Sequence, residues 1–504
     1  MKQIARIGGL LIAAAALGYL ALLAAGEPVL LWTDRLVFLL IAAIAGYFAY
    51  VRRHEHLAAP WRRVARSASG MAALVVLLAF VVVGVLDSLH FRPAMPGGDA
   101  QGNAIYAVEV QSALDSVLAP LRRRVETTYS APFATRAYAR ELIELQGEGG
   151  NAGRQLRDFP RLRWGGAHLQ DESQRGFDIF ATSMRALAAG FVAWWVLAGM
   201  IIAALARRQH RPAGEIWSAV WRGETAVPWR AVLATVAVLL LVAFPVAALA
   251  ARYHVLGTDK VGQDVLYLAL KSIRTGLVIG TLTTLVMMPF AVLLGIMAGY
   301  FKGWVDDVIQ YLYTTLNSIP SVLLIAAAVL MMQVYVDTRP ELFPTSAQRA
   351  DLRLLFLCII LALTSWTGLA RLLRGETLKL SELEYIQAAQ AFGVRDARII
   401  TRHILPNVMH IVLISLVMDF SGLVLAEAVL SYVGVGVDPS TISFGTMINA
   451  ARLEMSREPV VWWALAAAFV FMFLLVLAAN LFADAVRDAF DPRVRVGTLA
   501  NEAA

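Results

Sequence analysis

Long apolar runs separated by short polar segments make up most of the chain. A helix needs about 20 apolar residues to cross a bilayer. Runs of roughly this length occur at residues 7–25, 36–51, 71–86, 184–206, 231–250, 277–300, 308–334, 352–373, 408–430 and 460–486. The first could be a secretory signal, since Lys2 and Arg6 precede it, but it is longer than a signal core and a second run follows at once, which favours an anchor. The pattern predicts an all-α polytopic membrane protein with about ten transmembrane helices.

Composition supports the same class. Hydrophobic residues make up 59% of the 504 residues and charged residues 16%, against about 45–50% and about 25% in soluble domains, which excludes an ordinary soluble protein. The net charge of +7 is compatible with nucleic acid or an anionic surface, but the arginines cluster between apolar runs, so orientation in membrane lipid explains them and no nucleic-acid partner is expected. The single cysteine, Cys358, cannot form an intrachain disulfide or a Cys-rich metal site.

Arginine clusters predict the orientation of the spans. Short arginine-rich loops stay in the cytoplasm, and two such clusters follow the second and fourth runs: Arg52, Arg53, Arg62, Arg63 and Arg66, then Arg207, Arg208, Arg211, Arg222 and Arg230. With ten spans, both termini are then cytoplasmic in an inner (cytoplasmic) membrane protein. The long segment between the third and fourth runs lies outside, because long loops translocate regardless of their charge.

The external segment is expected to be a small helical domain. Residues 108–124 and 134–145 have apolar spacing compatible with helices, joined by a turn at Ser130-Ala131-Pro132, and a glycine-rich break follows at 147–151. The predicted division is an N-terminal extension with three spans (1–87), an extracytoplasmic insertion (88–182), a fourth span with a cytoplasmic linker (183–230), a six-helix core (231–493) and a tail (494–504).

The loop at 371–407 carries the strongest local pattern. Ser381 and Glu384 have the spacing of a capping box, with Ser381 at the N-cap. The helix that follows carries one apolar stripe (Tyr385, Ile386, Ala388, Ala389 and Phe392), and Gly393 breaks it; a second helix carries Ile399, Ile400 and Ile404 up to Leu405-Pro406. Adjacent alanines beside large aromatic residues suit insertion into a groove on a partner protein. An amphipathic helix lying on the membrane surface has the same spacing and remains an alternative.

Gln387-Ala388-Ala389, with Gly393 four positions after the second alanine and Leu405-Pro406 beyond, resembles the "EAA" loop of binding-protein-dependent ABC importer permeases. Two positions depart from that family's pattern: Gln387 replaces the leading Glu, and His403 stands where Ile is usual. The first departure removes an ionic group that could contact the ATPase, but it leaves the small residues and the glycine in place.

Further motifs in the same order resemble the dipeptide/oligopeptide (C-type) subunit of this family, over about 231–493. They are Leu256-Gly257-Thr258-Asp259 with Gly262-Gln263-Asp264-Val265, Ala298-Gly299-Tyr300-Phe301-x-Gly303-Trp304-x-Asp306, Ser318-Ile319-Pro320-Ser321, Ala426-Glu427-Ala428-x-Leu430-Ser431-Tyr432-x-Gly434, and Arg487-Asp488-Ala489-Phe490-Asp491-Pro492-Arg493. In the second part of the first motif, Gln263 replaces the common Arg. The resemblance does not extend over 1–229.

The resemblance implies an assembly. The chain would pair with a second permease subunit, two ATPase subunits and an extracytoplasmic solute-binding protein, and would import peptides or related solutes by alternating access. It would bind no cofactor itself, with ATP and Mg on the ATPase subunits. The loop at 383–395 would be the coupling helix that docks on the ATPase, through Tyr385, Gln387, Ala388, Ala389, Phe392, Gly393 and Arg395.

Several carboxyl, histidine and proline residues in or near the apolar runs are further candidates for a functional or structural role. Asp419 and Glu427 lie in or near the ninth run, where an ionised carboxylate costs at least about 2.5 kcal/mol unless it is paired or wetted. Either is a possible pathway residue, and Glu427 also fits a packing role. His54-Glu55-His56 is not a metal motif, because residues two apart on a helix point to different faces. Pro245 and Pro320 predict kinks in their spans.

No G-x-x-x-x-G-K-[ST] occurs in the sequence, so nucleotide would bind to another chain, and no catalytic constellation is predicted. The leading hypothesis is therefore a transport subunit that is not itself an enzyme. The alternative is a secondary transporter or membrane enzyme that works without an ATPase, with inverted repeats or convergent catalytic groups.

Overall fold

The computed structural model describes residues 26–98, 104–145, 154–339, 341, 343 and 345–490. The predicted first run, the glycine-rich break at 147–151 and the tail at 494–504 lie outside these residues. Within them, eight helices are long and apolar enough to cross a membrane: α2 (Trp32–Val51), α4 (Ala68–Asp87), α7 (Arg175–Gln209), α9 (Trp229–Ala250), α10 (Val265–Phe301), α13 and α14 together (Ser346–Ser381), α17 (Leu405–Val433) and α19 (Trp463–Phe490).

A broken pair of helices accounts for the remaining predicted run. Helices α11 (Gly303–Ser318) and α12 (Ser321–Asp337) pass the same length and hydropathy test together, with a bend of 88° between them. Pro320 lies at this break, where its missing N–H and fixed backbone angle end the first helix. Pro245, by contrast, lies inside α9. The all-α polytopic class is confirmed, and all nine predicted runs within the described residues fall on helices.

The insertion is not the helical domain that its spacing predicted. In the described residues between β4 and β5, helix forms at α5 (Ala113–Val117), which Ser112 and Asp115 begin with a capping box, and at α6 (Ala119–Arg123). The predicted helix at 134–145 is wrong: β5 (Glu141–Leu145) pairs antiparallel with β6 (Arg154–Asp158). The other strands are β1 (Gly26–Val29), β2 (His90–Gly98), β3 (Ala104–Tyr106) and β4 (Gln111–Ser112). These strands are short and depend on their pairing partners, and β1 pairs with a strand about 60 residues away, so their local spacing did not reveal them.

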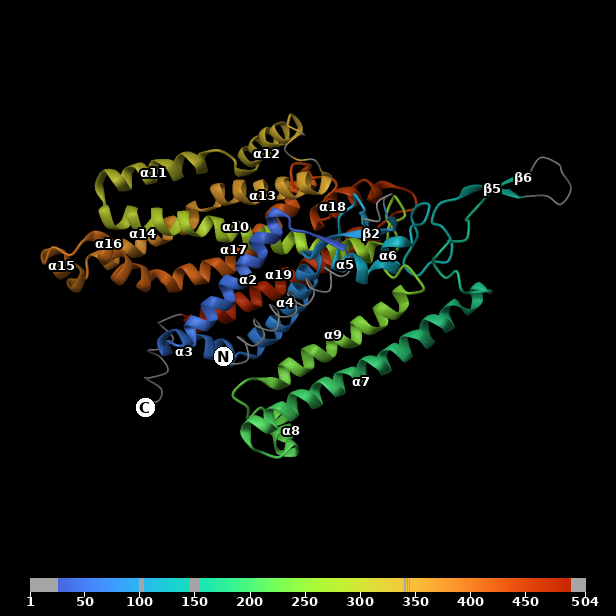
Figure 1. The fold of residues 1–504 in the computed structure, drawn as a ribbon, viewed down its shortest axis with the longest axis horizontal. Coiled ribbons are helices and arrows are strands. Elements are labelled where there is room, and N and C mark those ends of the chain that lie inside the picture. The colour runs from blue at the N-terminus through green and yellow to red at the C-terminus, as the bar shows by residue number, and fades with distance from the viewer. Residues whose placement is uncertain are drawn as a thin grey trace.

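Strand β2 joins the insertion to the N-terminal extension. It pairs with β1, which precedes α2, and with β3 and β4, which follow it within the insertion. The strands gather at one end of the bundle, and the short helices α3 (Glu55–Val64), α8 (Ala213–Arg222) and α15 (Glu384–Ala391) lie toward the opposite end (Figure 1). The insertion is therefore continuous, through β1, with the beginning of α2.

Helix α10 is the centre of the bundle. It packs against α14, α17, α13 and α4. Two of its glycines allow α14 to approach closely, since a Cβ at Gly295 would lie 2.7 Å from the Ala370 carbonyl oxygen and one at Gly299 would lie 2.7 Å from that of Arg374. Small residues at helix interfaces permit such contact in membranes, where close packing replaces the hydrophobic effect.

Helices α7, α8 and α9 form an arm beside the bundle. Helix α9 packs mainly on α7 and α4, and α4 in turn packs on α19 and α10. Figure 1 shows this arm below the bundle, with α8 at its tip. A helix of the N-terminal extension thus lies between α9, which the sequence placed in the six-helix core, and the helices α10 and α19 of that core.

Candidate coupling helix and transport pathway

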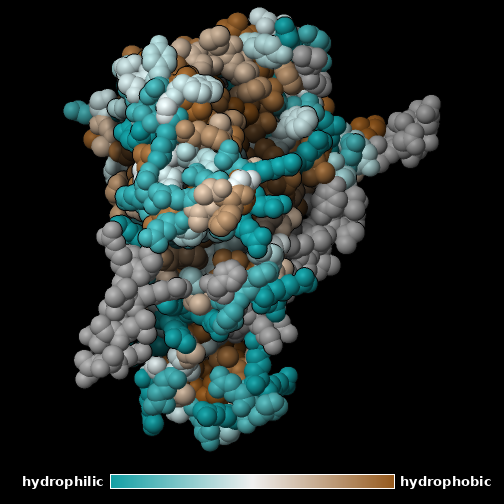
Figure 2. Space-filling model, turned by 90° about the vertical axis from the view of Figure 1, so that its left-hand side faces the viewer, coloured by the Kyte–Doolittle hydropathy of each residue, from teal (hydrophilic) through white to brown (hydrophobic). Residues whose placement is uncertain are grey.

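Helix α15 protrudes at one end of the bundle. It follows α14 after two residues and leads through a glycine turn into α16 (Asp396–Ile399), a π-helical turn η3 (Ile400–Ile404) and α17. Figure 1 shows α15 and α16 at the extreme left, and Figure 2 looks onto this end, which is largely covered by hydrophilic residues. The predicted second helix therefore does not stop at Leu405-Pro406 but continues into the membrane span.

The predicted capping box at Ser381 is wrong. Ser381 is the last residue of α14, it is buried, and its hydroxyl donates to the carbonyl of Leu378. Helix α15 begins at Glu384 with Leu383 at the N-cap and no side-chain cap. The spacing was correct for a box, but packing of α14 against α10 extends that helix through the position where the cap was expected.

The two faces of α15 differ sharply. Ile386 is fully buried in the core cluster that also contains Ile399 and Ile404. On the other face, Tyr385 is 46% exposed and Phe392 is 86% exposed, with Ala388 exposed between them. These three residues, at i, i+3 and i+7, form what we call the outer face of α15.

The two alanines therefore do not share one surface. Ala388 is exposed, whereas Ala389 is half-buried and packs against the core cluster. Successive residues on a helix point about 100° apart, so the bundle beneath α15 decides which alanine is covered. The small residue available to a partner is Ala388.

Polar contacts fix α15 to the bundle. Tyr300, at the end of α10, donates to Asp396 (2.7 Å) and accepts from Gln390 (3.3 Å). Asn407 donates to the Tyr385 hydroxyl at 3.2 Å. Lys302 pairs with Glu382, and this ammonium group lowers the pKa of the exposed carboxyl. Helices α10 and α17 thereby hold the loop from both sides.

The remaining predicted coupling residues shape the turn. Gln387 donates its side-chain amide to the Glu382 carbonyl at 3.2 Å, a bond that the family's usual glutamate could not donate. Gly393 has φ +70°, with open space around its Cα, so the left-handed backbone and not crowding favours glycine here. Arg395 is exposed and is the N-cap residue of α16.

The two intramembrane carboxyls have different surroundings. Glu427 is 1% exposed and accepts hydrogen bonds from Ser431 (2.7 Å) and Ser443 (2.8 Å). Because Ser443 is the N-cap of α18 (Phe444–Arg452), this carboxyl ties α18 to α17. Asp419 lies at the middle of α17, is half-buried, and has no hydrogen bond or ion pair within the described residues. The geometry favours packing for Glu427 and leaves Asp419 available.

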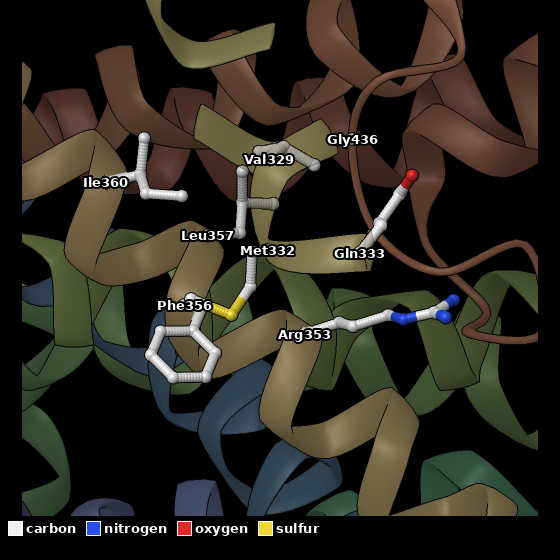
Figure 3. A pocket seen from close by; sticks show the side chains of 8 residues that line it. All are labelled: Val329, Met332, Gln333, Arg353, Phe356, Leu357, Ile360 and Gly436. Carbon is white, nitrogen blue, oxygen red and sulfur yellow. The ribbon is translucent and has the colours of Figure 1, made fainter. Parts of the chain in front are cut away.

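Asp419 borders an exposed apolar stripe on α17. Met418, Leu425, Val429 and Tyr432 are 44%, 43%, 53% and 44% exposed. The cavity between α12 and α13 is a poorer solute site, because its volume is about 10 Å³, room for about one water molecule. Figure 3 shows its lining side chains, including Met332 and Phe356, from these two helices. A solute path therefore fits the α17 surface better than that cavity.

Two buried ionic clusters were not predicted. Arg274 of α10 lies 2.6 Å from Asp34 of α2 and 3.8 Å from Asp351 of α13, and His90 bonds Asp34 at 2.8 Å. The sequence signal that could have indicated this cluster is the charged residues at the ends of apolar runs, since such residues need partners. Their pairing joins segments that are far apart in the chain.

The second cluster joins the insertion to the loop that precedes α10. His254 lies between Asp264 (2.7 Å) and Glu126 (3.3 Å), and all three are buried. Burial by itself would lower the pKa of His254, but the hydrogen bonds to Asp264 and Glu126 outweigh it and raise the pKa to about 9. Burial would raise the pKa of Glu126, whereas bonds from His254 and the backbone N–H groups of residues 163–165 lower it to about 2. The histidine is thus a cation shared by two carboxylates.

Comparison with known proteins assigns the chain to a family. Residues 291–496 match the family described as "Binding-protein-dependent transport system inner membrane component". The oligopeptide transport system permease protein OppC of Mycobacterium tuberculosis (strain H37Rv) is 33% identical over 242 residues, covering 48% of this chain and 77% of that protein. The chain belongs to this family. Its α15 loop and α17 carboxyls all lie within the matched residues.

A second permease and a solved transporter structure are also similar to this chain. The glutathione transport system permease protein GsiD of Pectobacterium atrosepticum is 33% identical over 244 residues, covering 48% of this chain and 73% of that protein. A structure of the MetNI methionine ABC transporter in inward-facing conformations aligns over 45% of this chain and 98% of that chain, with 16% identity and a TM-score of 0.35. Family members are transport permeases, so the alternative of a secondary transporter or membrane enzyme is set aside.

Proposed function

We propose that this chain is one permease half of an ATP-driven importer for peptides or related solutes, and that α15 transmits the motion of the ATPase to the spans. The observation that carries the proposal is the outer face of α15. Phe392 is 86% exposed beside Ala388, while Ile386 on the opposite face is fully buried. Two aromatic knobs flanking a small residue suit a groove on a partner protein.

The fixed base of α15 supports this role. A force on α15 reaches α10 through Tyr300 and α17 through Asn407, because these residues bond the loop directly. Transport needs a two-state element that both ATP and solute bias. The proposed partners are a second permease subunit, two ATPase subunits that bind ATP and Mg²⁺, and an extracytoplasmic binding protein. Phosphoryl transfer belongs to the ATPase subunits.

The orientation follows from the arginine clusters. The end that carries α3, α8 and α15 faces the cytoplasm, and the strands of the insertion face outward. Both termini are then cytoplasmic.

Asp419 is the proposed pathway residue. It is a mid-span carboxyl with no partner among the residues that the structure describes, and it lies beside the exposed stripe of α17. A carboxylate there would pair with the amino group of a peptide, since an intramembrane charge requires an opposite charge or water. The relatives are permeases of oligopeptide and glutathione transport systems, which supports peptides as the solute class.

The experiment is assembly of the full importer with the Ala388→Asp variant. A carboxylate trapped in the groove contact costs several kcal/mol, and each 1.4 kcal/mol is tenfold in an equilibrium. Retention of the ATPase subunits on the tagged permease should therefore fall at least about 100-fold, and solute-stimulated ATP hydrolysis should be lost.

The matched control is Ala213→Asp. Ala213 is also an exposed alanine of a short helix toward the same end, but it is the first residue of α8 in the arm. This variant should assemble and transport normally. If Ala388→Asp retains its ATPase subunits and transports at the unmodified rate, α15 is a surface helix only.

A further inference from the structure

A large cavity opens between the arm and the bundle. It has a volume of about 610 Å³ and is lined by residues that precede and begin α4, end α8 and begin α9. It lies toward the same end as α15, where α8 forms the tip of the arm (Figure 1). In Figure 2 the arm is the lower lobe, and hydrophobic surface there is framed by hydrophilic residues. The coupling helix does not line this cavity.

Two arginines line the cavity without a counter-ion. Arg66 precedes α4 and Arg230 lies in the first turn of α9, and neither has an ion pair in the part of the chain that the structure describes. The ion pair found nearby, between Arg62 and Glu55, does not involve them. Two arginines that line one cavity suit a phosphate group, which guanidinium binds with paired hydrogen bonds.

The rest of the wall is apolar. Its apolar lining residues are Ala68, Val220, Ala226, Pro228, Ala231 and Ala234. A soluble phosphate would leave this surface unused, whereas a phospholipid carries hydrocarbon next to its phosphate.

Tryptophans place the cavity at the level of the membrane interface. Trp217 and Trp221 lie on α8, and Trp229 begins α9. Trp217 also stacks on Trp195 of α7, at 5.2 Å between ring centroids. Tryptophan gathers at the boundary between headgroups and hydrocarbon, so the cavity is at the depth where a lipid phosphate lies.

We propose that this cavity binds an anionic glycerophospholipid, with its phosphate between Arg66 and Arg230 and its acyl chains along the alanine-lined wall. The lipid would fill the gap between α4 and the arm and hold α9 against the bundle. This site is independent of the solute path and of the ATPase contact.

The test uses the purified full-length chain and native mass spectrometry, with phosphatidylglycerol and phosphatidylcholine as the probes. Phosphatidylglycerol should bind more tightly, and Arg66→Gln with Arg230→Gln should weaken it about 30-fold, or about 2 kcal/mol at about 1 kcal/mol for each basic residue. The double lysine variant (Arg66→Lys, Arg230→Lys) should keep most of the binding, which separates lost charge from lost folding.

The control pair is Arg208→Gln with Arg211→Gln, which removes two exposed arginines of the same arm that do not line the cavity. It should change binding less than about threefold. An equal loss in this pair, or equal binding of both lipids, would overturn the proposal. Displacement of phosphatidylglycerol by millimolar inorganic phosphate would instead identify a site for free anions and would also overturn it.

Discussion

Docking of the insertion onto the bundle should depend on pH through His254. The cluster joins Glu126 of the insertion to residues 254–264, which precede α10. Two more bonds join the same segments: the Glu126 N–H donates to the Gly262 carbonyl, and the Ser130 N–H donates to the Thr258 hydroxyl. The pKa of His254 rises from 6.5 to about 9 on docking. At about 1.4 kcal/mol per pKa unit, this difference corresponds to about 3 kcal/mol.

The sign follows from the direction of each pKa change. Below pH 6.5 the imidazole is protonated in both the docked and the undocked state, so the full stabilisation is present. As the pH rises from 6.5 through about 9, the undocked histidine loses its proton first and the advantage of docking disappears. The pKa of Glu126 is lowered to about 2, so its contribution is present above about 4.5 and is lost as the pH falls toward 2. Docking should be strongest between about pH 4.5 and 6.5.

Hydrogen exchange measures this directly. After correction for intrinsic exchange rates, protection of backbone amides at 126–130 and 254–264 should fall about 100-fold between pH 6.5 and 9.5. Amides in the middle of α10 should not change. In His254→Ala, protection of the two segments should be low at both pH values, because two buried carboxylates then lack their shared cation. Equal protection in the unmodified chain at pH 6.5 and 9.5 would refute the reasoning.

Three further predictions concern the spans and their orientation. Asp419→Asn should raise the transport KM for peptides with a free amino terminus about tenfold and leave N-acetylated peptides unchanged; an equal effect on both would rule out amine recognition. In a Cys358→Ser background, Val108→Cys should react with an impermeant thiol reagent from outside and Gly214→Cys should not, and the reverse would invert the topology. Arg274→Leu should destabilise the chain by about 3–5 kcal/mol, since it leaves buried carboxylates unpaired, as judged by thermal unfolding in detergent; an unchanged midpoint would contradict that role.

The spans were predictable because a single segment that crosses lipid must be a helix. A hydrocarbon solvent requires every backbone group to bond internally, so a long apolar run must be a helix. The run at 36–51 lies within Trp32–Val51, and Pro320 marks the break between α11 and α12. Neither result depended on knowing which other segments lie nearby.

The insertion was not predictable for the opposite reason. Strand β2 pairs with β1 across more than 60 residues, and β5 pairs with β6. Short segments with mixed spacing carry little information about such partners. The capping-box prediction at Ser381 failed for a similar reason. Its spacing to Glu384 matched a capping box, but tertiary packing extends α14 through Ser381.

The motif located the loop that we propose as the coupling element, but it did not show which face of α15 is exposed. Ala388 and Ala389 are adjacent in the sequence, and only the position of the bundle shows that Ala388 is the exposed one. Glu427 and Asp419 were equivalent as intramembrane carboxyls until the two serine bonds to Glu427 separated them. In each case, the missing information was how the helix packs against the rest of the bundle.

The extra spans and the insertion are bonded to the end of α10 that lies away from α15. Arg274, two turns or so into α10, binds Asp34 of α2, and His254 binds Glu126 of the insertion just before α10 begins. Both bonds lie at or just before the start of this helix, whereas α15 contacts its opposite end through Tyr300. If ATP-driven movement enters at α15, the extension and insertion must follow the start of α10 as one body, because separating them would expose buried charges. The flexible part of the motion then lies between these two ends, along the spans themselves, where the break at Pro320 offers one hinge.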